Sequence, residues 1–121
     1  MILIVDDDRS CRMSLMRLLQ GMRYQVMAAG SAAEALRIAL HETPTVVLMD
    51  IHLDDHNGID VARALKEHSS LAETRIIALS ASAMRRDSEF DALFHRVLVK
   101  PCQADAFREA IDGCVAPSGA R

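Results

Sequence analysis

Each of four short apolar runs in this sequence ends in side chains that could take part in chemistry. Three carboxylates follow the first run, one follows the second, a hydroxyl follows the third and an ammonium group follows the fourth. In chain order these side chains are Asp6, Asp7 and Asp8, then Asp50, then Ser80, then Lys100. Carboxylates that lie close together repel one another unless a proton or a cation neutralises them. If the fold brings the four runs side by side, the sequence therefore predicts a cation site.

The residue types limit which cation and which reaction such a site would suit. Oxygen ligands without a neighbouring cysteine or histidine pair favour a hard divalent ion, Mg²⁺ or Mn²⁺. One carboxylate could then act as a nucleophile towards phosphorus, as in aspartyl-phosphate chemistry. The metal, the Lys100 ammonium group and the Ser80 hydroxyl would neutralise the three equatorial oxygens of the transferring phosphoryl group. The pattern thus indicates metal-dependent phosphoryl transfer to a carboxylate.

Short apolar segments alternate with amphipathic ones along the chain. Continuous apolarity is typical of parallel strands that are covered on both faces. The predicted strands are residues 2–5, 46–49, 76–79 and 97–99, with a weaker segment at 24–29. Apolar residues at helical spacing predict helices over residues 10–22, 31–40, 59–65, 83–94 and 107–114, of which 83–94 has the weakest pattern.

Local signals support several of these boundaries. Asp8 is interpreted as a helix cap or a solvated residue. Ser31 and Glu34 have the spacing of a capping box at the start of the second helix. The dipeptide Asn57-Gly58 predicts a turn before the third helix. Cys11 and the methionines are interpreted as core residues that fill space.

The alternation of strands and helices predicts an α/β fold. Right-handed crossovers between five βα units give a parallel sheet with helices on both faces. Five units are too few to close a barrel, which needs eight, so a doubly wound (βα)5 three-layer sandwich is expected. In such a sheet the carboxyl ends of the strands share one edge, where ligands bind. The acidic, hydroxyl and ammonium side chains should therefore meet at that edge.

Composition excludes several classes of protein. The 121 residues suit one domain, with 1–115 as its body and 116–121 as a tail or the start of a linker. A net charge of −3 and the absence of tryptophan argue against a nucleic-acid surface, and no apolar run approaches the roughly 18–20 residues of a membrane helix. Three cysteines without a CxxC pair favour the reducing cytoplasm. Only Lys66 and Lys100 are lysines among 14 basic residues, which draws attention to Lys100.

The chain resembles a response-regulator receiver domain of two-component signalling over nearly its whole length. The resemblance rests on Asp6-Asp7, Asp50, Ser80 and Lys100-Pro101 in this order and spacing. It implies a flavodoxin-like strand order, 2-1-3-4-5, and Asp50 as the phosphoacceptor. It also implies that Asp7, the Asp50 side chain and the backbone carbonyl of His52 bind Mg²⁺ directly, with help from Asp6 and with Mn²⁺ as an alternative ion.

The resemblance assigns further roles around the phosphoryl group. Lys100 would contact it, and Ser80 would be the switch residue that turns towards it. His52 and Ser82 would flank the attacking water and tune the lifetime of the acyl phosphate. The second switch position, often Tyr or Phe in the family, is Val97 here. An aromatic rotamer switch is therefore not expected, whereas the acidic pocket retains the family pattern.

The resemblance also implies partners. A histidine kinase or a histidine phosphotransfer protein would donate the phosphoryl group, and the first helix would help to dock it. The domain would catalyse its own phosphorylation and autodephosphorylation as a signalling domain, not as an enzyme with a separate substrate. A phosphorylation-linked dimer is left open, and no direct contact with nucleic acid or membrane is expected.

Other interpretations compete with this one. A receiver-like interaction module that works without phosphorylation is suggested by Val97 and by the altered loop before the last strand. A phosphatase with Asp50 as nucleophile usually carries a second aspartate two residues later, but this chain has His52. His52 and His56 have the i, i+4 spacing of a metal pair, although a solvated loop explains them better. Arg85-Arg86 is interpreted as a solvated helix start.

Overall fold

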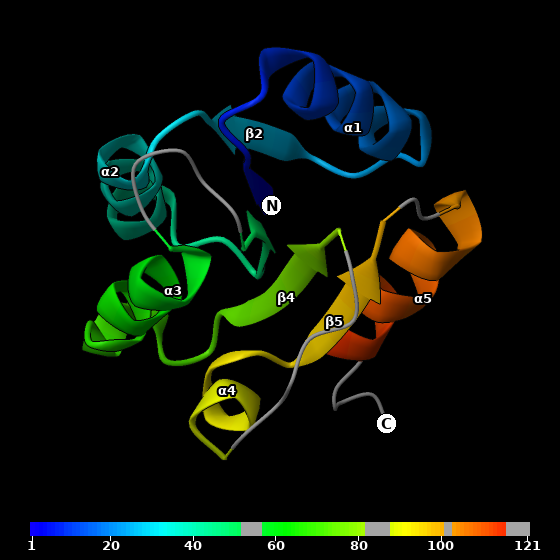
Figure 1. Ribbon diagram of the computed structural model, residues 1–121. Coiled ribbons are helices and arrows are strands. Elements are labelled where there is room, and N and C mark those ends of the chain that lie inside the picture. The colour runs from blue at the N-terminus through cyan, green and yellow to red at the C-terminus, as the bar shows by residue number, and fades with distance from the viewer. Residues whose placement is uncertain (52–56, 82–87, 101–102, 116–121) are drawn as a thin grey trace.

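The computed structural model describes residues 1–51, 57–81, 88–100 and 103–115, and it forms one parallel sheet with helices on both sides (Figure 1). In chain order the elements are β1 (Ile2–Val5), α1 (Arg9–Gly21), β2 (Val26–Ala29), α2 (Ala32–Glu42), β3 (Val46–Asp50), α3 (Gly58–Lys66), a 3-10 turn (Ser69–Leu71), β4 (Arg75–Ser80), α4 (Ser88–Leu93), β5 (Arg96–Val99) and α5 (Ala104–Val115). The strand order is β2-β1-β3-β4-β5, and every pairing is parallel. The predicted doubly wound fold is confirmed.

Two apolar layers hold the helices against the sheet. Because successive strand residues point to opposite faces, Leu3 and Val5 of β1 pack on one side and Ile2 and Ile4 on the other. Residues of α2, α3 and α4 complete the first layer, and residues of α1 and α5 complete the second (Figure 1). Burying one large aliphatic side chain contributes about 1.5–3 kcal/mol, so the two layers are the main source of stability.

Helix caps fix where three of the helices begin. The Asp8 side chain accepts a hydrogen bond from the backbone N–H of Cys11, which confirms Asp8 as a cap. The Ser31 hydroxyl likewise accepts from the N–H of Glu34. The carboxylate of Glu34, however, accepts from the N–H of Gly30, so the predicted capping box is closed one residue earlier than expected. Asn57 caps α3 by accepting from the N–H of Ile59.

Other local expectations need correction. Cys11 is exposed and does not fill the core, because it lies in the first turn of α1. Met13 and Met27 are also exposed, whereas Met49 is buried. The expected helix 83–94 is described only over Ser88–Leu93, since residues 82–87 lie outside the described part of the chain. Residues 116–121, expected to form a tail or linker, lie outside it as well.

No helix in the described residues is both long enough and apolar enough to cross a membrane.

Candidate functional site

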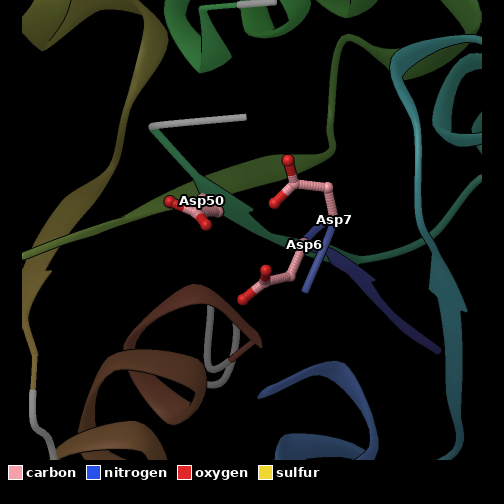
Figure 2. A group of neighbouring side chains, drawn as sticks. All are labelled: Asp6, Asp7 and Asp50. Atoms are coloured by element: carbon pink, nitrogen blue, oxygen red, sulfur yellow. The ribbon is translucent and has the colours of Figure 1, made fainter. Parts of the chain in front are cut away.

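Three carboxylates meet at the carboxyl ends of β1 and β3. The two strands are neighbours, with Val5 opposite Met49, so the residues that follow, Asp6 and Asp50, come to lie side by side. One carboxylate oxygen each from Asp6, Asp7 and Asp50 lie within 4.8 Å of one another (Figure 2). The fold therefore brings together three of the four aspartates that the sequence singled out. Asp8, the fourth, caps α1 instead.

Burial disfavours the negative charge of this cluster of carboxylates. Asp6 is 2% exposed and Asp50 is 8% exposed. Burial raises the pKa of Asp6, because the charged carboxylate loses its hydration, and the nearby Asp50 and Asp7 charges act in the same direction. A hydrogen bond from the backbone N–H of Asp8 and the charge of Lys100 oppose this rise. The pocket therefore favours the uptake of positive charge.

Lys100 supplies part of that positive charge from the far edge of the sheet. Its ammonium nitrogen lies 3.6 Å from Oδ2 of Asp6 and 3.7 Å from Oδ2 of Asp50. The residue directly follows β5, and its backbone N–H donates to the carbonyl oxygen of Ser80, which holds the end of β5 against β4. The Lys100 side chain remains 34% exposed. It can therefore contact both the carboxylates and a ligand that approaches from solvent.

Ser80 and Val97 occupy the two expected switch positions. Ser80 is the last residue of β4 and is fully buried at the same edge of the sheet as Asp50. Val97 lies in β5 opposite Ala78 and is half-buried. It packs against the apolar layer that contains Phe90 of α4. The strand neighbour of Val97 is thus Ala78, which lies two residues before Ser80 in β4.

Several residues with expected roles lie outside the described part of the chain. They are His52 and Ser82, which were expected to flank the water, and also His56, Arg85, Arg86 and Pro101. The metal-binding carbonyl assigned to His52 and the peptide bond before Pro101 therefore remain expectations.

The donor set of the described residues fits Mg²⁺. Asp6, Asp7 and Asp50 offer only oxygen atoms, which hard divalent cations prefer. Within the described ranges, no other group of three His, Cys, Asp or Glu side chains comes close enough to hold a metal ion. The acidic edge is therefore the metal-binding candidate that these residues provide.

A hollow of about 370 Å³ opens beside the acidic edge between α1 and α5. It is lined by Asp6, Cys11, Ser14, Leu15, Leu18, Leu79, Lys100 and Phe107. Its walls are mainly apolar, while Asp6 and Lys100 stand at its border with the site. The hollow gives a ligand or a partner side chain access to the acidic edge.

The sequence did not indicate the roles of two residues at the site. A Cβ atom on Gly58 would lie 2.4 Å from the carbonyl oxygen of Asp50, so only glycine allows this approach of α3 to β3. Asn57-Gly58 was predicted only as a turn. Arg12 donates from Nη1 to the carbonyl oxygen of Asp6 at 2.8 Å. No motif indicated Arg12, because its contact depends on how α1 lies against the sheet.

Comparison with known sequences agrees with the geometry. Residues 2–112 match the family described as response regulator receiver domain. The chain is 35% identical over 89 residues to the polar-differentiation response regulator DivK of Brucella ovis. That match covers 73% of this chain and 72% of the relative.

Solved structures with the same fold support the comparison. The chemotaxis protein CheY4 of Vibrio cholerae superposes with a TM-score of 0.87 at 25% identity, covering 94% of this chain and 97% of that one. The response regulator TrrA of Thermotoga maritima, solved in complex with Mg²⁺-BeF, gives a TM-score of 0.84 at 25% identity over the same shares of the two chains.

Proposed function

Because the chain belongs to the response regulator receiver domain family, we propose that it is a phosphorylation-dependent switch whose phosphoacceptor is Asp50. Receiver domains of two-component systems are signalling domains that interact with histidine kinases or phosphotransfer proteins. The observation that carries the proposal is the position of the Asp50 carboxylate. One of its oxygen atoms lies within 4.8 Å of a carboxylate oxygen of Asp6 and one of Asp7, and Oδ2 lies 3.7 Å from the ammonium nitrogen of Lys100.

The chemical step is nucleophilic attack on a phosphohistidine donor. A carboxylate oxygen of Asp50 attacks the phosphorus and forms a new P–O bond, while the P–N bond to the donor imidazole breaks. The electron pair of that bond stays on the imidazole nitrogen, which takes a proton from solvent. Mg²⁺, or Mn²⁺ in its place, would be held by Asp6, Asp7, Asp50 and the carbonyl of His52 and would neutralise the phosphoryl oxygens. Lys100, whose ammonium nitrogen lies 3.7 Å from Oδ2 of Asp50, would contact the same oxygens.

The phosphoryl group is then lost by a separate step, hydrolysis of the acyl phosphate. Water attacks the phosphorus, the P–O bond to Asp50 breaks, and inorganic phosphate leaves. We assign His52 and Ser82 to the flanks of that water, where their side chains would set the lifetime of the phosphorylated state. Both the gain and the loss of the phosphoryl group would thus be catalysed by the domain itself.

The signal would leave the site through Ser80 and Val97. Ser80 would turn its hydroxyl towards the phosphoryl group, and the end of β4 would move with it. Val97 is one strand away and packs against the apolar layer that contains Phe90, so the movement would reach α4 and β5 through repacking of an aliphatic side chain. Phosphorylation would shift the population between two packed arrangements of this face.

The donor would be a histidine kinase or a histidine phosphotransfer protein that docks on α1. This helix borders the hollow that leads to Asp6 and Lys100, so a donor histidine entering there would approach Asp50 from the solvent side. The free cysteines Cys11 and Cys114 suit work in the reducing cytoplasm. A dimer linked to phosphorylation is left open.

The test is phosphorylation by a small donor. The protein is incubated with acetyl phosphate and Mg²⁺, and its intact mass is followed. We expect one added phosphoryl group, which disappears in Asp50→Asn and in the presence of a chelator. Asp60→Asn is the matched control, because Asp60 is an exposed acid of α3 paired with Arg63. This variant should be labelled like the wild type.

A negative result would also be informative. If neither acetyl phosphate nor a fluoroberyllate mimic binds at Asp50, the proposed switch is wrong. The phosphorylation-independent interaction module would then be the better description. Labelling that persists in Asp50→Asn would show that another residue accepts the phosphoryl group.

A further inference from the structure

Arg12 reaches from the first turns of α1 to the backbone of the acidic edge. Its Nη1 donates to the carbonyl oxygen of Asp6 at 2.8 Å, and this contact is partly buried. A charged donor makes such a hydrogen bond stronger than a neutral one. The contact is made to the main chain, so it leaves the Asp6 carboxylate available.

The carbonyl that Arg12 holds belongs to the peptide bond between Asp6 and Asp7. A peptide unit is planar, so fixing its carbonyl oxygen also fixes the direction of the following N–H and Cα. The other side of Asp6 is already held, because its N–H donates to the carbonyl of Ala29 at 3.2 Å. Arg12 therefore limits the rotation of this peptide plane and so helps to set the position of the Asp7 Cα atom, from which the side chain extends.

Gly30 provides the space in which the guanidinium group lies. A Cβ atom on Gly30 would stand 2.9 Å from Nη1 and 3.3 Å from Cζ of Arg12. The φ angle of Gly30 is not positive, so its backbone does not require glycine. The absence of a side chain at this position is explained by the guanidinium group that covers it.

We propose that Arg12, seated on Gly30, is a positioning residue that aims the Asp7 carboxylate at the metal site. The inference rests on the proposed function, since it assumes that Asp6, Asp7 and Asp50 bind Mg²⁺. Arg12 contributes through the peptide plane and touches neither the metal nor the phosphoryl group. Its loss should weaken Mg²⁺ binding while leaving Asp50 and Lys100 able to react once Mg²⁺ is saturating.

The test compares Arg12→Met, Gly30→Ala and the double variant by calorimetric titration with Mg²⁺. Arg12→Met should weaken Mg²⁺ binding about tenfold, as the loss of a residue that orients a ligand commonly does. Gly30→Ala displaces the guanidinium group but keeps its charge, and its effect should lie between that of the wild type and Arg12→Met. The double variant should bind no more weakly than Arg12→Met, because both changes remove the same contact.

Two further measurements separate positioning from a general structural role. In the metal-free protein, the NMR signal of the Asp7 amide should move in both single variants. With acetyl phosphate, Arg12→Met should need more Mg²⁺ for half-maximal labelling but reach the wild-type rate at saturation. Arg17→Met is the matched control, since it removes an exposed arginine from the same helix and should change neither quantity. If Arg12→Met does not fold, Gly30→Ala carries the test alone.

Clear outcomes would overturn the inference. An unchanged Mg²⁺ affinity in Gly30→Ala and Arg12→Met, with a wild type that binds Mg²⁺ and is labelled, would refute the positioning role alone. Equal weakening in Arg17→Met would show a general effect of changing α1, without positioning. A wild type that neither binds Mg²⁺ nor accepts a phosphoryl group would refute the proposed function, and the inference with it.

Discussion

Gly58 packs directly on the backbone of Asp50, so that a Cβ atom at this position would stand 2.4 Å from the Asp50 carbonyl oxygen. The N–H of Gly58 also donates to the carbonyl of Ile51 at 2.8 Å. The start of α3 is thus fixed against the end of β3, where the proposed phosphoacceptor lies. The obstacle to a side chain is main chain and cannot move aside as a flexible side chain could.

Gly58→Ala should therefore destabilise the protein and disturb the site. Overpacking of this kind costs about 1–3 kcal/mol, measured as the free energy of unfolding in a urea titration. Labelling by acetyl phosphate should also slow, because the Asp50 backbone has to shift. Gly21→Ala is the control: nothing lies within 4 Å of its Cβ position at the end of α1, so stability should stay the same or rise. Equal stability of the two variants would contradict the packing argument.

Lys100→Met should strengthen Mg²⁺ binding while it slows phosphorylation. The ammonium group lies 3.6 Å and 3.7 Å from Asp6 and Asp50 and competes with a metal ion for the same negative charge. Removing one such charge contact near solvent should make the free energy of Mg²⁺ binding more favourable by about 1 kcal/mol, which is about a fivefold gain in affinity. Calorimetric titration measures this gain. Labelling should slow because the phosphoryl oxygens lose a cation.

The control for this prediction is Lys66→Met, which removes the same charge from the end of α3. It should leave Mg²⁺ affinity unchanged. Weaker Mg²⁺ binding in Lys100→Met would mean that the lysine helps to build the metal site, contrary to the competition inferred from its distances.

The strand ends could be predicted from the sequence because they depend on a simple rule. Continuous apolar runs indicated parallel strands, and parallel strands place their carboxyl ends at one edge. That rule was enough to bring Asp6, Asp7, Asp50 and Lys100 together before any distance was known. Asp8 was also predictable as a cap, since its contact with the N–H of Cys11 spans only three residues.

The contacts around these residues could not be predicted in the same way. Arg12 reaches Asp6 and Gly58 reaches Asp50 only through the docking of α1 and α3 on the sheet. Cys11 follows the apolar spacing of α1 but is exposed, because the first turn of the helix lies by the site edge, where Cys11 lines the hollow. Periodicity describes a helix face and does not state where along the helix that face leaves the core.

The pKa of His95 should lie below the ordinary value of 6.5. Burial lowers the pKa first, and the positive charges of Arg75 and Arg96 lower it further. Lys66 and Asp91 line the same pocket. Because the folded state disfavours the imidazolium, this residue makes the free energy of unfolding depend on pH. The free energy of unfolding is highest above pH 6.5 and decreases as the pH falls from 6.5 through the lower pKa of the folded state.

An NMR titration of the His95 ring protons measures whether the pKa of His95 lies below 6.5. Arg75→Gln should move the His95 pKa up towards 6.5, since one of the charges that oppose protonation is gone. Arg37→Gln, on α2, is the control and should leave the titration unchanged. A His95 pKa above 6.5 in the wild type would show that an acidic neighbour outweighs burial and both arginines.

Thr74→Val should lower stability without changing Mg²⁺ affinity. The Thr74 hydroxyl is buried and donates to the carbonyl oxygen of Pro44 at 2.7 Å, which ties the entry of β4 to the entry of β3. Valine has a similar shape but leaves that carbonyl without its donor, at a cost of about 1–3 kcal/mol in the free energy of unfolding. The contact lies at the amino ends of the strands, whereas Asp50 lies at the carboxyl end of β3.

Thr45→Val provides the matched change at an exposed threonine next to β3 and should leave stability within about 0.5 kcal/mol of the wild type. Calorimetric titration below the unfolding transition should give both variants the wild-type Mg²⁺ affinity. A weaker affinity in Thr74→Val would mean that strain passes along β3 from Pro44 to Asp50. The metal site would then depend on packing at the far end of the sheet, and the site could not be treated as a local arrangement of three carboxylates and one lysine.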